Sequence, residues 1–212
     1  MKRTISKMAI LSAITIFACG TLHAQFRYGV HAGLNMVTQA ENGALWDNCD
    51  VYHGYNLGGF LEYKTKSIFS IQTELNYQKK GSKSEDYSGN HTVTYKNELN
   101  YLTVPLLCRV SPVNAEADRN YNLSFLAGPY ISFLTSTHSR MNNGSEDLPV
   151  DISKNAEDLD AGAVFGGGVI YKLSGNKALT AEIRYEMGMR SIVSDKPDLR
   201  NKGLGFTLGY IF

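Results

Sequence analysis

Large apolar residues occupy every second position in the last eleven residues of the chain, KGLGFTLGYIF at 202–212. The positions between them are glycine or threonine: Gly203, Gly205, Thr207 and Gly209. This alternation predicts a β-strand with one apolar face and one polar face. Because the polar face carries little side-chain volume and the chain stops on an aromatic residue, the segment is typical of the closing strand of a membrane β-barrel.

Seven further segments show the same period of two, and turn-forming residues separate them. The predicted strands cover 26–37, 54–64, 68–80, 97–110, 121–134, 158–173, 178–190 and 202–212. The predicted connections are short or intermediate at 65–67, 111–120 and 174–177, and long at 38–53, 81–96, 135–157 and 191–201. Short turns at one end and long loops at the other predict an all-β fold, an eight-stranded antiparallel up-and-down transmembrane β-barrel with its turns in the periplasm.

The volume of the side chains decides which face points outward. An eight-stranded barrel has an interior just wide enough for its side chains. Phe, Tyr and Leu residues from all eight strands would overfill it, whereas the glycine-rich polar faces fit. We therefore expect the apolar faces to contact lipid and the polar faces to line the lumen, in contrast to a soluble barrel that binds an apolar ligand inside.

Several charged residues fall on the predicted lumen faces. This candidate lumen network consists of Arg27, His31, Glu62, Glu74, Arg109, Asp160, Glu182, Arg184 and Glu186. Carboxylates removed from bulk water must pair with cations or bind a ligand. We favour a plug of ion pairs and hydrogen bonds; the alternatives are a polar conduit for ions or small solutes and catalysis by the carboxylates.

Aromatic residues gather at the strand ends that the prediction places on the periplasmic side. They are Phe26, Tyr28, Tyr63, Phe69, Tyr121, Tyr171, Tyr210 and Phe212. Rings of this kind are enriched at membrane–water interfaces. We expect them to form an aromatic girdle against outer-membrane lipid.

The first 24 residues have the features of a secretory signal peptide. Lys2, Arg3 and Lys7 precede a short apolar stretch, which is too short to span a membrane as a helix, and cleavage is expected after Ala24. A lipoprotein signal acylated at Cys19 is the alternative. The expected domains are thus a signal peptide at 1–24 and an outer-membrane barrel at 25–212.

Charge and cysteine content limit the partners. The signal segment holds three of the 21 basic residues and none of the 20 acidic ones, so the rest of the chain has a net charge of −2. This balance gives no electrostatic attraction to nucleic acid. Cys49 and Cys108 remain, one expected in a loop and one in a strand, and we do not expect a disulfide between them.

Eight segments together resemble the PorT-like outer-membrane β-barrel proteins: FRYGVHAGLN at 26–35, LGGFLEYK at 57–64, QTELNYQKKG at 72–81, YLTVPLL at 101–107, FLAGPYISFL at 125–134, DAGAVFGGGVIYKL at 160–173, EIRYEMGM at 182–189 and the terminal LGFTLGYIF. The resemblance implies a small barrel of the outer membrane. It implies no catalytic motif, and the family's namesake is implicated in protein secretion across the outer membrane.

The loops hold weaker candidates for chemistry. The segment from Trp46 to His53 contains a thiol, an imidazole and two carboxylates, but lacks a second Cys–His pair at zinc-ligand spacing. The acidic residues of 135–157 and Asp158 lack EF-hand spacing. Gly162, Gly166 and Gly168 fall within an alternating strand on the lumen face, where we expect them to make room for long side chains opposite.

We therefore assign no catalytic, cofactor-binding or metal-binding residue, and we do not expect an enzyme. The sequence favours a structural, surface-interaction or secretion-accessory protein of the outer membrane. The expected partners are lipid, the barrel-assembly machinery during insertion, and secretion components or extracellular ligands at the four long loops 38–53, 81–96, 135–157 and 191–201. A narrow channel is the alternative, and an outer-membrane hydrolase or acyltransferase a further one.

Overall fold

A computed structural model of the chain describes most of the predicted barrel. The described residues are 26–40, 51–65, 68–88, 91–112, 120–142, 147–150, 157–191 and 200–212. The predicted signal peptide at 1–24 lies outside these ranges, as does Cys49 with the residues around it from 41 to 50. No helix in the described part of the chain is long and apolar enough to cross a membrane.

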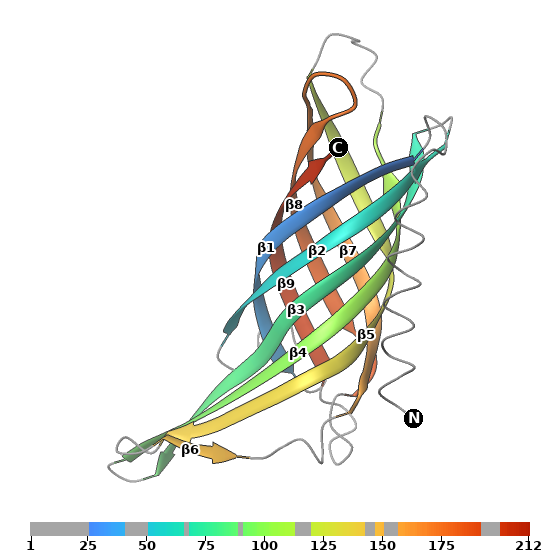
Figure 1. Ribbon diagram of the computed structural model, residues 1–212. Helices are drawn as coiled ribbons and strands as arrows, with labels where there is room; N and C mark the ends of the chain where they lie inside the picture. Colours follow the sequence, from blue (N-terminus) through green and yellow to red (C-terminus); the bar gives the residue numbers. More distant parts are fainter. Residues whose placement is uncertain are drawn as a thin grey trace.

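The described residues form nine β-strands (Figure 1). They are β1 (Phe26–Ala40), β2 (Tyr52–Lys64), β3 (Phe69–Ser88), β4 (His91–Val110), β5 (Tyr121–Asn142), β6 (Asp147–Val150), β7 (Leu159–Lys172), β8 (Ala178–Gly188) and β9 (Arg200–Ile211). All pairings between them are antiparallel.

Eight of these strands close into a barrel, as the alternation predicts. If the short β6 is left aside, each strand pairs with the next one along the chain, and β1 pairs with β9 to bring the two ends of the sheet together. The ring is completed between β4 and β5 and between β5 and β7. The structure is thus a closed eight-stranded antiparallel barrel, and β6 adds to the outer part of β5.

The two ends of the barrel differ. At the end that we call the turn end, β2 ends and β3 begins, β4 ends and β5 begins, and β7 ends and β8 begins. The start of β1 and the end of β9 lie at this same end. There Phe212 N donates to Tyr28 O at 3.0 Å. Gly175, with φ of 71°, permits the tight turn between β7 and β8. The opposite end is the loop end.

At the loop end, β1, β2 and β9 exceed the predicted bounds by two or three residues, and three other strands exceed them by six to eight. β3, β4 and β5 continue past the loop end and carry β6 with them (Figure 1). We call residues 79–88, 91–100, 135–142 and 147–150 the sheet extension. The prediction of loops at 81–96 and 135–157 was therefore wrong over most of the first range and part of the second. Ladder pairs such as Ser82 with Asn97 and Asn97 with Ser139 supply backbone hydrogen bonds there, so polar segments that lack an apolar face still form strands.

The interior contains apolar residues as well as the predicted polar ones. Near the turn end, Phe60, Ile170, Ala178 and Ile211 form a buried cluster. Leu107, Leu126, Tyr130 and Val164 form a second cluster, and Leu99 with Tyr101 forms a third. The lumen is therefore filled by both kinds of side chain, as expected for an eight-stranded barrel.

Candidate functional site

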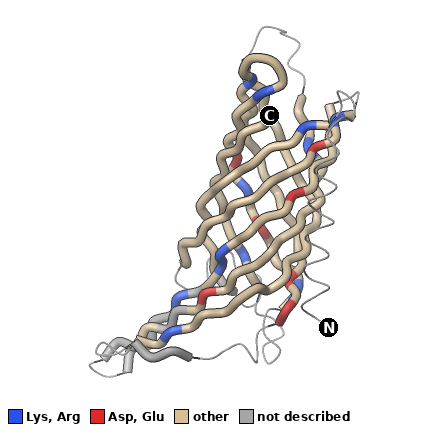
Figure 2. Tube along the Cα trace, in the orientation of Figure 1, with Lys and Arg blue, Asp and Glu red and all other residues tan. Residues whose placement is uncertain are grey.

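The alternation of burial along each strand identifies the lumen face. In β3 the even-numbered residues from Ser70 to Lys80 are buried, whereas Ile71, Leu75 and Tyr77 are exposed. The same two-residue period places the charged residues of the other barrel strands inside, and charged positions recur along the strands between the two ends (Figure 2). A polar lumen and an apolar outer surface follow directly from the sequence pattern.

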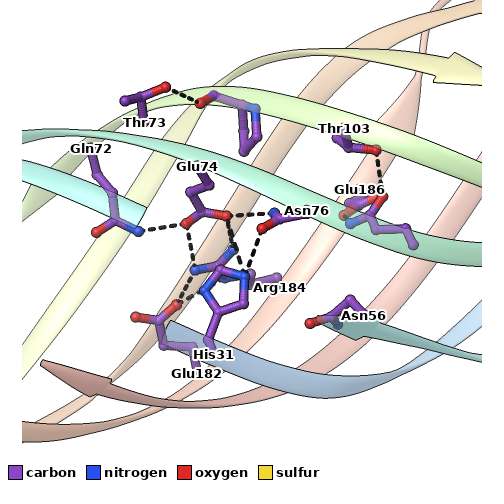
Figure 3. Close-up of polar contacts among 12 residues, drawn as sticks. His31, Asn56, Gln72, Thr73, Glu74, Asn76, Thr103, Glu182, Arg184 and Glu186 are labelled. Atoms are coloured by element: carbon purple, nitrogen blue, oxygen red, sulfur yellow. Dashed lines mark hydrogen bonds and ion pairs between the residues drawn. The ribbon is translucent and has the colours of Figure 1, made fainter. Parts of the chain in front are cut away.

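Arg184 lies at the centre of the lumen. Its guanidinium donates to both oxygens of Glu74, at 2.8 and 2.9 Å, and its Nε donates to Glu182 at 2.8 Å (Figure 3). Arg109 donates to the other oxygen of Glu182 at 2.8 Å. Two arginines and two carboxylates from β3, β4 and β8 thereby form one continuous network across the barrel. Such bidentate, charge-assisted bonds have defined geometry as well as strength.

Amide and imidazole groups surround the Glu74 carboxylate. Gln72 Nε2 and Asn76 Nδ2 both donate to it, the latter at 2.7 Å. Because Asn76 donates through its nitrogen, its oxygen must accept, and it lies 2.8 Å from His31 Nε2. His31 therefore carries a proton on Nε2. The imidazole contacts an amide rather than a serine or cysteine nucleophile, so this arrangement lacks the geometry of a catalytic triad.

A smaller ion pair lies near the turn end. Arg27 Nη2 is 2.6 Å from Glu62 Oε2, and Ser70 Oγ donates to the other oxygen of Glu62 at 2.6 Å. Glu62 itself is buried. The apolar cluster around Phe60 lies at this same end of the barrel. The turn end of the lumen is thus occupied by an ion pair together with apolar packing.

Lys80 forms the corresponding centre toward the loop end. Its Nζ lies 2.9 Å from Glu186 and 3.8 Å from Asp160. The rings of Tyr130 and Tyr101 flank the ammonium group, with centroids at 4.8 and 5.6 Å. A buried lysine is stabilised by opposite charge and by aromatic faces of this kind. Lys80 therefore connects β3 to the carboxylates of β7 and β8.

Little space remains between these side chains. A cavity of about 20 Å³ lies beside Arg184 and Glu186, and Asn35, Asn56, Asn76 and Gln78 also line it. This volume is close to the minimum that one water molecule needs. A second cavity, of about 140 Å³, lies nearer the loop end beside Val37, Thr38 and Lys202. Around the central ion pairs, the lumen is thus filled by its own side chains.

The comparisons with known proteins give the family. The family described as "Outer membrane protein beta-barrel domain" matches residues 18–194. The chain belongs to this outer-membrane barrel family. It is accordingly a protein of the outer membrane, and the eight-stranded barrel is its membrane-embedded fold. The narrower PorT-like membership stays a prediction. A search of curated proteins found no significant match.

Several solved structures are similar to this outer-membrane barrel at low identity. The attachment invasion locus protein Ail of Yersinia pestis is 13% identical, with 89% of this chain and 99% of that chain covered and a TM-score of 0.41. Neisserial surface protein A is 12% identical, with coverage of 87% and 97% and a TM-score of 0.45. OprG from Pseudomonas aeruginosa is 11% identical, with coverage of 88% and 94% and a TM-score of 0.44.

All nine residues of the candidate lumen network lie on the inner face. The structure joins Glu74, Glu182, Arg184, Arg109 and His31 into the central network. Arg27 and Glu62 form the separate pair at the turn end, and Asp160 and Glu186 meet at Lys80. Arg27 and Glu186 are only partly buried.

Sequence reasoning missed several lumen residues. Lys80, Gln72, Gln78 and Thr103 share the inward parity of the predicted network and are buried. Gln78 Nε2 donates to Glu186 at 2.7 Å and its oxygen accepts from Thr103 at 2.9 Å. The two-residue period of β3 was sufficient to find Lys80, because it lies six positions after Glu74.

Three of the four glycines of β7, those with lumen parity, lie beside long lumen side chains, as the sequence predicts. A Cβ at Gly162 would lie 2.8 Å from the Tyr130 ring, and one at Gly166 would lie 3.2 Å from Arg184 Cγ. A Cβ at Gly168 would lie 2.7 Å from Glu182 Cγ. Gly166 and Gly168 thus leave space for the central network, and Gly162 leaves space for the Tyr130 ring.

The eight aromatic residues predicted for the membrane interface lie at the turn end, on the outer surface. Phe26 packs on Tyr63 with ring centroids 5.0 Å apart, and Tyr28 stacks on Phe212 at 5.4 Å. Tyr210 meets Phe212 edge-on at 5.0 Å. Their arrangement is that expected for a girdle, and contact with lipid headgroups remains a prediction.

The weaker candidates of the loops are only partly described. Trp46 and Cys49 lie outside the described residues, as do Glu146 and Asp151 of the 135–157 segment. Within the described ranges, no three or more His, Cys, Asp and Glu side chains form a group that would hold a metal. Cys108 is a free cysteine exposed on the outer face of β4.

Proposed function

We propose that this protein is a closed outer-membrane barrel that acts by contact with another protein through its loop end, and that it does not conduct solutes. The observation that carries the proposal is the filled lumen. Ion pairs occupy it near the turn end, at the centre and toward the loop end, and the cavity between them has room for about one water molecule. A conduit would need a continuous column of water.

The sheet extension supplies the surface for contact. It continues β3, β4 and β5 beyond the barrel and is held by backbone ladders, by the Lys79–Glu98 ion pair at 2.8 Å and by the hydrogen bond from Asn100 to Ser136 at 2.9 Å. Strand pairing makes this surface more ordered than a loop of the same length. Less ordering entropy is then lost when a partner binds.

The PorT-like resemblance favours a component of a secretion system as the partner. Within the proposal, the barrel anchors the extension in the membrane and the extension recruits that component. A role in adhesion at the cell surface would also use the sheet extension, and only the identity of the partner would differ.

Site-specific photocrosslinking in intact cells tests the proposal. A photoreactive residue at Arg140, which is exposed on the extension, should yield a protein adduct that mass spectrometry identifies. The matched control is Leu208 on the lipid face, where no protein adduct is expected. Adducts from Ser174 at the turn end alone would contradict the proposal, because the contact surface would then lie at the wrong end.

A shortened variant tests whether the extension is needed. Ser82 and Asn97 are paired opposite each other in β3 and β4, so residues between them are replaceable by a two-residue Asn-Gly turn. The barrel ladder below this pair is unchanged, and the variant should therefore still fold. We expect the adduct at Arg140 to disappear, since its register partner Lys96 is removed.

A further inference from the structure

The cavity of about 140 Å³ toward the loop end lies on the outer side of the barrel wall. Val37 and Gly203, which have inward parity, line it together with a larger set of residues that have outward parity. The outward set, which we call the wall pocket, consists of Met36, Thr38, Val51, Tyr185, Lys202 and Leu204. The wall pocket is therefore separate from the central network in the lumen.

The strand register brings the residues of the wall pocket together. The register pairs are Met36 with Leu204, Thr38 with Lys202, and Tyr185 with Leu204. Val51 comes directly before Tyr52, which is the register partner of Val37. Residues directly opposite each other in an antiparallel pair share one face of the sheet. The pocket is thus one patch of the outer face that crosses the adjacent strands β2, β1, β9 and β8.

Most of the pocket lining is apolar and continuous with the lipid face. Met36 and Leu204 are exposed, and Leu34 and Phe206 extend the same exposed face along β1 and β9 toward the middle of the barrel. An apolar cavity of about 150 Å³ holds a molecule of the size of benzene. The wall pocket, at about 140 Å³, is therefore large enough for about six carbon atoms of a lipid acyl chain.

The order of residues along the strands matches the order of groups in a membrane lipid. In β9, Lys202 lies closer to the loop end than Leu204 and Phe206, and in β1 Thr38 lies closer to it than Met36. Lys202 is 7% exposed despite its outward parity. Thr38 is also buried, and its hydroxyl has no hydrogen-bond partner. The polar groups thus lie on the side of the headgroups, where a lysine attracts anionic lipid.

We propose that the wall pocket binds an anionic membrane lipid, with part of one acyl chain in the pocket and the phosphate of the headgroup beside Lys202 and Thr38. A neutral lipid loses the attraction to Lys202, and a phosphate without a chain loses the burial of apolar surface. The bound lipid contacts β1, β2, β8 and β9 at the loop end. The site is independent of the partner proposed for the sheet extension, which is built from β3, β4, β5 and β6.

Native mass spectrometry of the purified protein in detergent tests the site. The protein is titrated with phosphatidylglycerol or with phosphatidylcholine of identical acyl chains, so that the two lipids differ only in headgroup and net charge. We expect saturable binding of one lipid molecule. Phosphatidylglycerol should bind about fivefold more tightly, which is the preference that one lysine gives near a membrane surface.

Two pairs of matched variants locate the chain and the headgroup. Val51→Trp fills the pocket and should abolish binding of both lipids, whereas Leu208→Trp, on the same outer face but outside the pocket, should leave it unchanged. Val51→Phe replaces the first variant if heat-dependent gel mobility shows that it does not fold. Lys202→Gln should bring the affinity for phosphatidylglycerol down to that for phosphatidylcholine, and Lys202→Arg should keep the preference.

Absence of saturable phosphatidylglycerol binding to the unmodified protein would overturn the proposal. Equal loss in the folded Val51 variant and in Leu208→Trp would do the same, because lipid would then bind anywhere on the outer face. Equal affinities for the two lipids, or a preference that survives in Lys202→Gln, would also overturn it, since Lys202 would then not contact the headgroup.

Discussion

Arg184 and Glu74 are 110 positions apart in the sequence, yet the guanidinium of one donates to both carboxylate oxygens of the other across the lumen, at 2.8 and 2.9 Å. The pair joins β8 to β3, which are not neighbours in the sheet. Contacts of this kind cross the interior of the barrel rather than follow its wall. They fix the position of opposite strands and occupy the space that a channel would need.

The first prediction concerns this pair. Arg184→Leu should lower the free energy of unfolding by about 3–5 kcal/mol, because Glu74 and Glu182 then stay buried without their main counter-charge. Glu74→Leu combined with Arg184→Leu should cost less than the sum of the two single changes. Urea unfolding in lipid vesicles, analysed as a double-mutant cycle, measures both. If the effects of the two single changes were strictly additive, Glu74 and Arg184 would each be hydrated and would not interact.

The second prediction compares Gly167 and Gly168, adjacent residues of β7 at which an added Cβ would point to opposite faces of the sheet. A Cβ at Gly168 would lie 2.2 Å from Ala181 O and 2.7 Å from Glu182 Cγ, whereas the nearest atom to a Cβ at Gly167 is on Phe125 at 3.4 Å. Gly168→Ala should therefore destabilise the barrel by about 1–3 kcal/mol through overpacking. Gly167→Ala should be close to neutral. Heat-dependent gel mobility of the folded form compares them, and similar stabilities would contradict the assigned faces.

The third prediction tests the lipid face. Phe206 is 50% exposed in the middle of β9, and its register partners Leu34 and Ile183 are also exposed. Phe206→Arg should cost about 2–4 kcal/mol near the bilayer midplane. The control Phe206→Leu keeps the position apolar and should fold normally into vesicles. An arginine variant as stable as the leucine variant would place this face outside the hydrocarbon.

The alternation of residues was sufficient to predict much of the fold. In β1, β8 and β9 the two-residue period assigns most side chains to the lumen or to the surface without further information. Thr38 and Lys202, at the loop end, are exceptions, because they have outward parity and are buried. The lumen residues followed from the same parity, together with the rule that buried carboxylates need partners. The sequence did not predict which lumen side chains pair with each other, because it contains no direct information on how the strands are staggered around the barrel.

The sheet extension was not predictable from the same pattern. Residues 82–88, SKSEDYS, have no apolar face and contain the residues common in loops. Their strand form depends on pairing with β4, whose far edge pairs in turn with β5. Apolar residues inside the barrel, such as Ile170 and Ile211, were missed for a different reason. Their positions have lumen parity, but the prediction treated the lumen as wholly polar.

The fourth prediction is the orientation of the barrel. Asn176→Cys at the turn end should be protected from a membrane-impermeant thiol reagent in intact cells, and Asn142→Cys on the sheet extension should be labelled. Asn176 is preferable to Gly175, whose positive φ disfavours a side chain. The background variant needs Cys108→Ser and Cys49→Ser, because Cys108 is exposed. Labelling of Asn176→Cys alone would show the opposite orientation.

The central claim is that the lumen is closed by its own side chains, and single-channel recording in planar bilayers tests it most directly. Aqueous channels occur in barrels of about sixteen strands or more, whereas an interior of eight strands is about wide enough for side chains alone. With the central network intact and a cavity of about 20 Å³ beside it, the purified protein should show no stable, reproducible conductance. The Arg184→Leu variant, incorporated at matched protein density, shows whether loosening the network admits ions. A steady open channel in the unmodified protein would contradict the account and would favour the narrow-channel alternative.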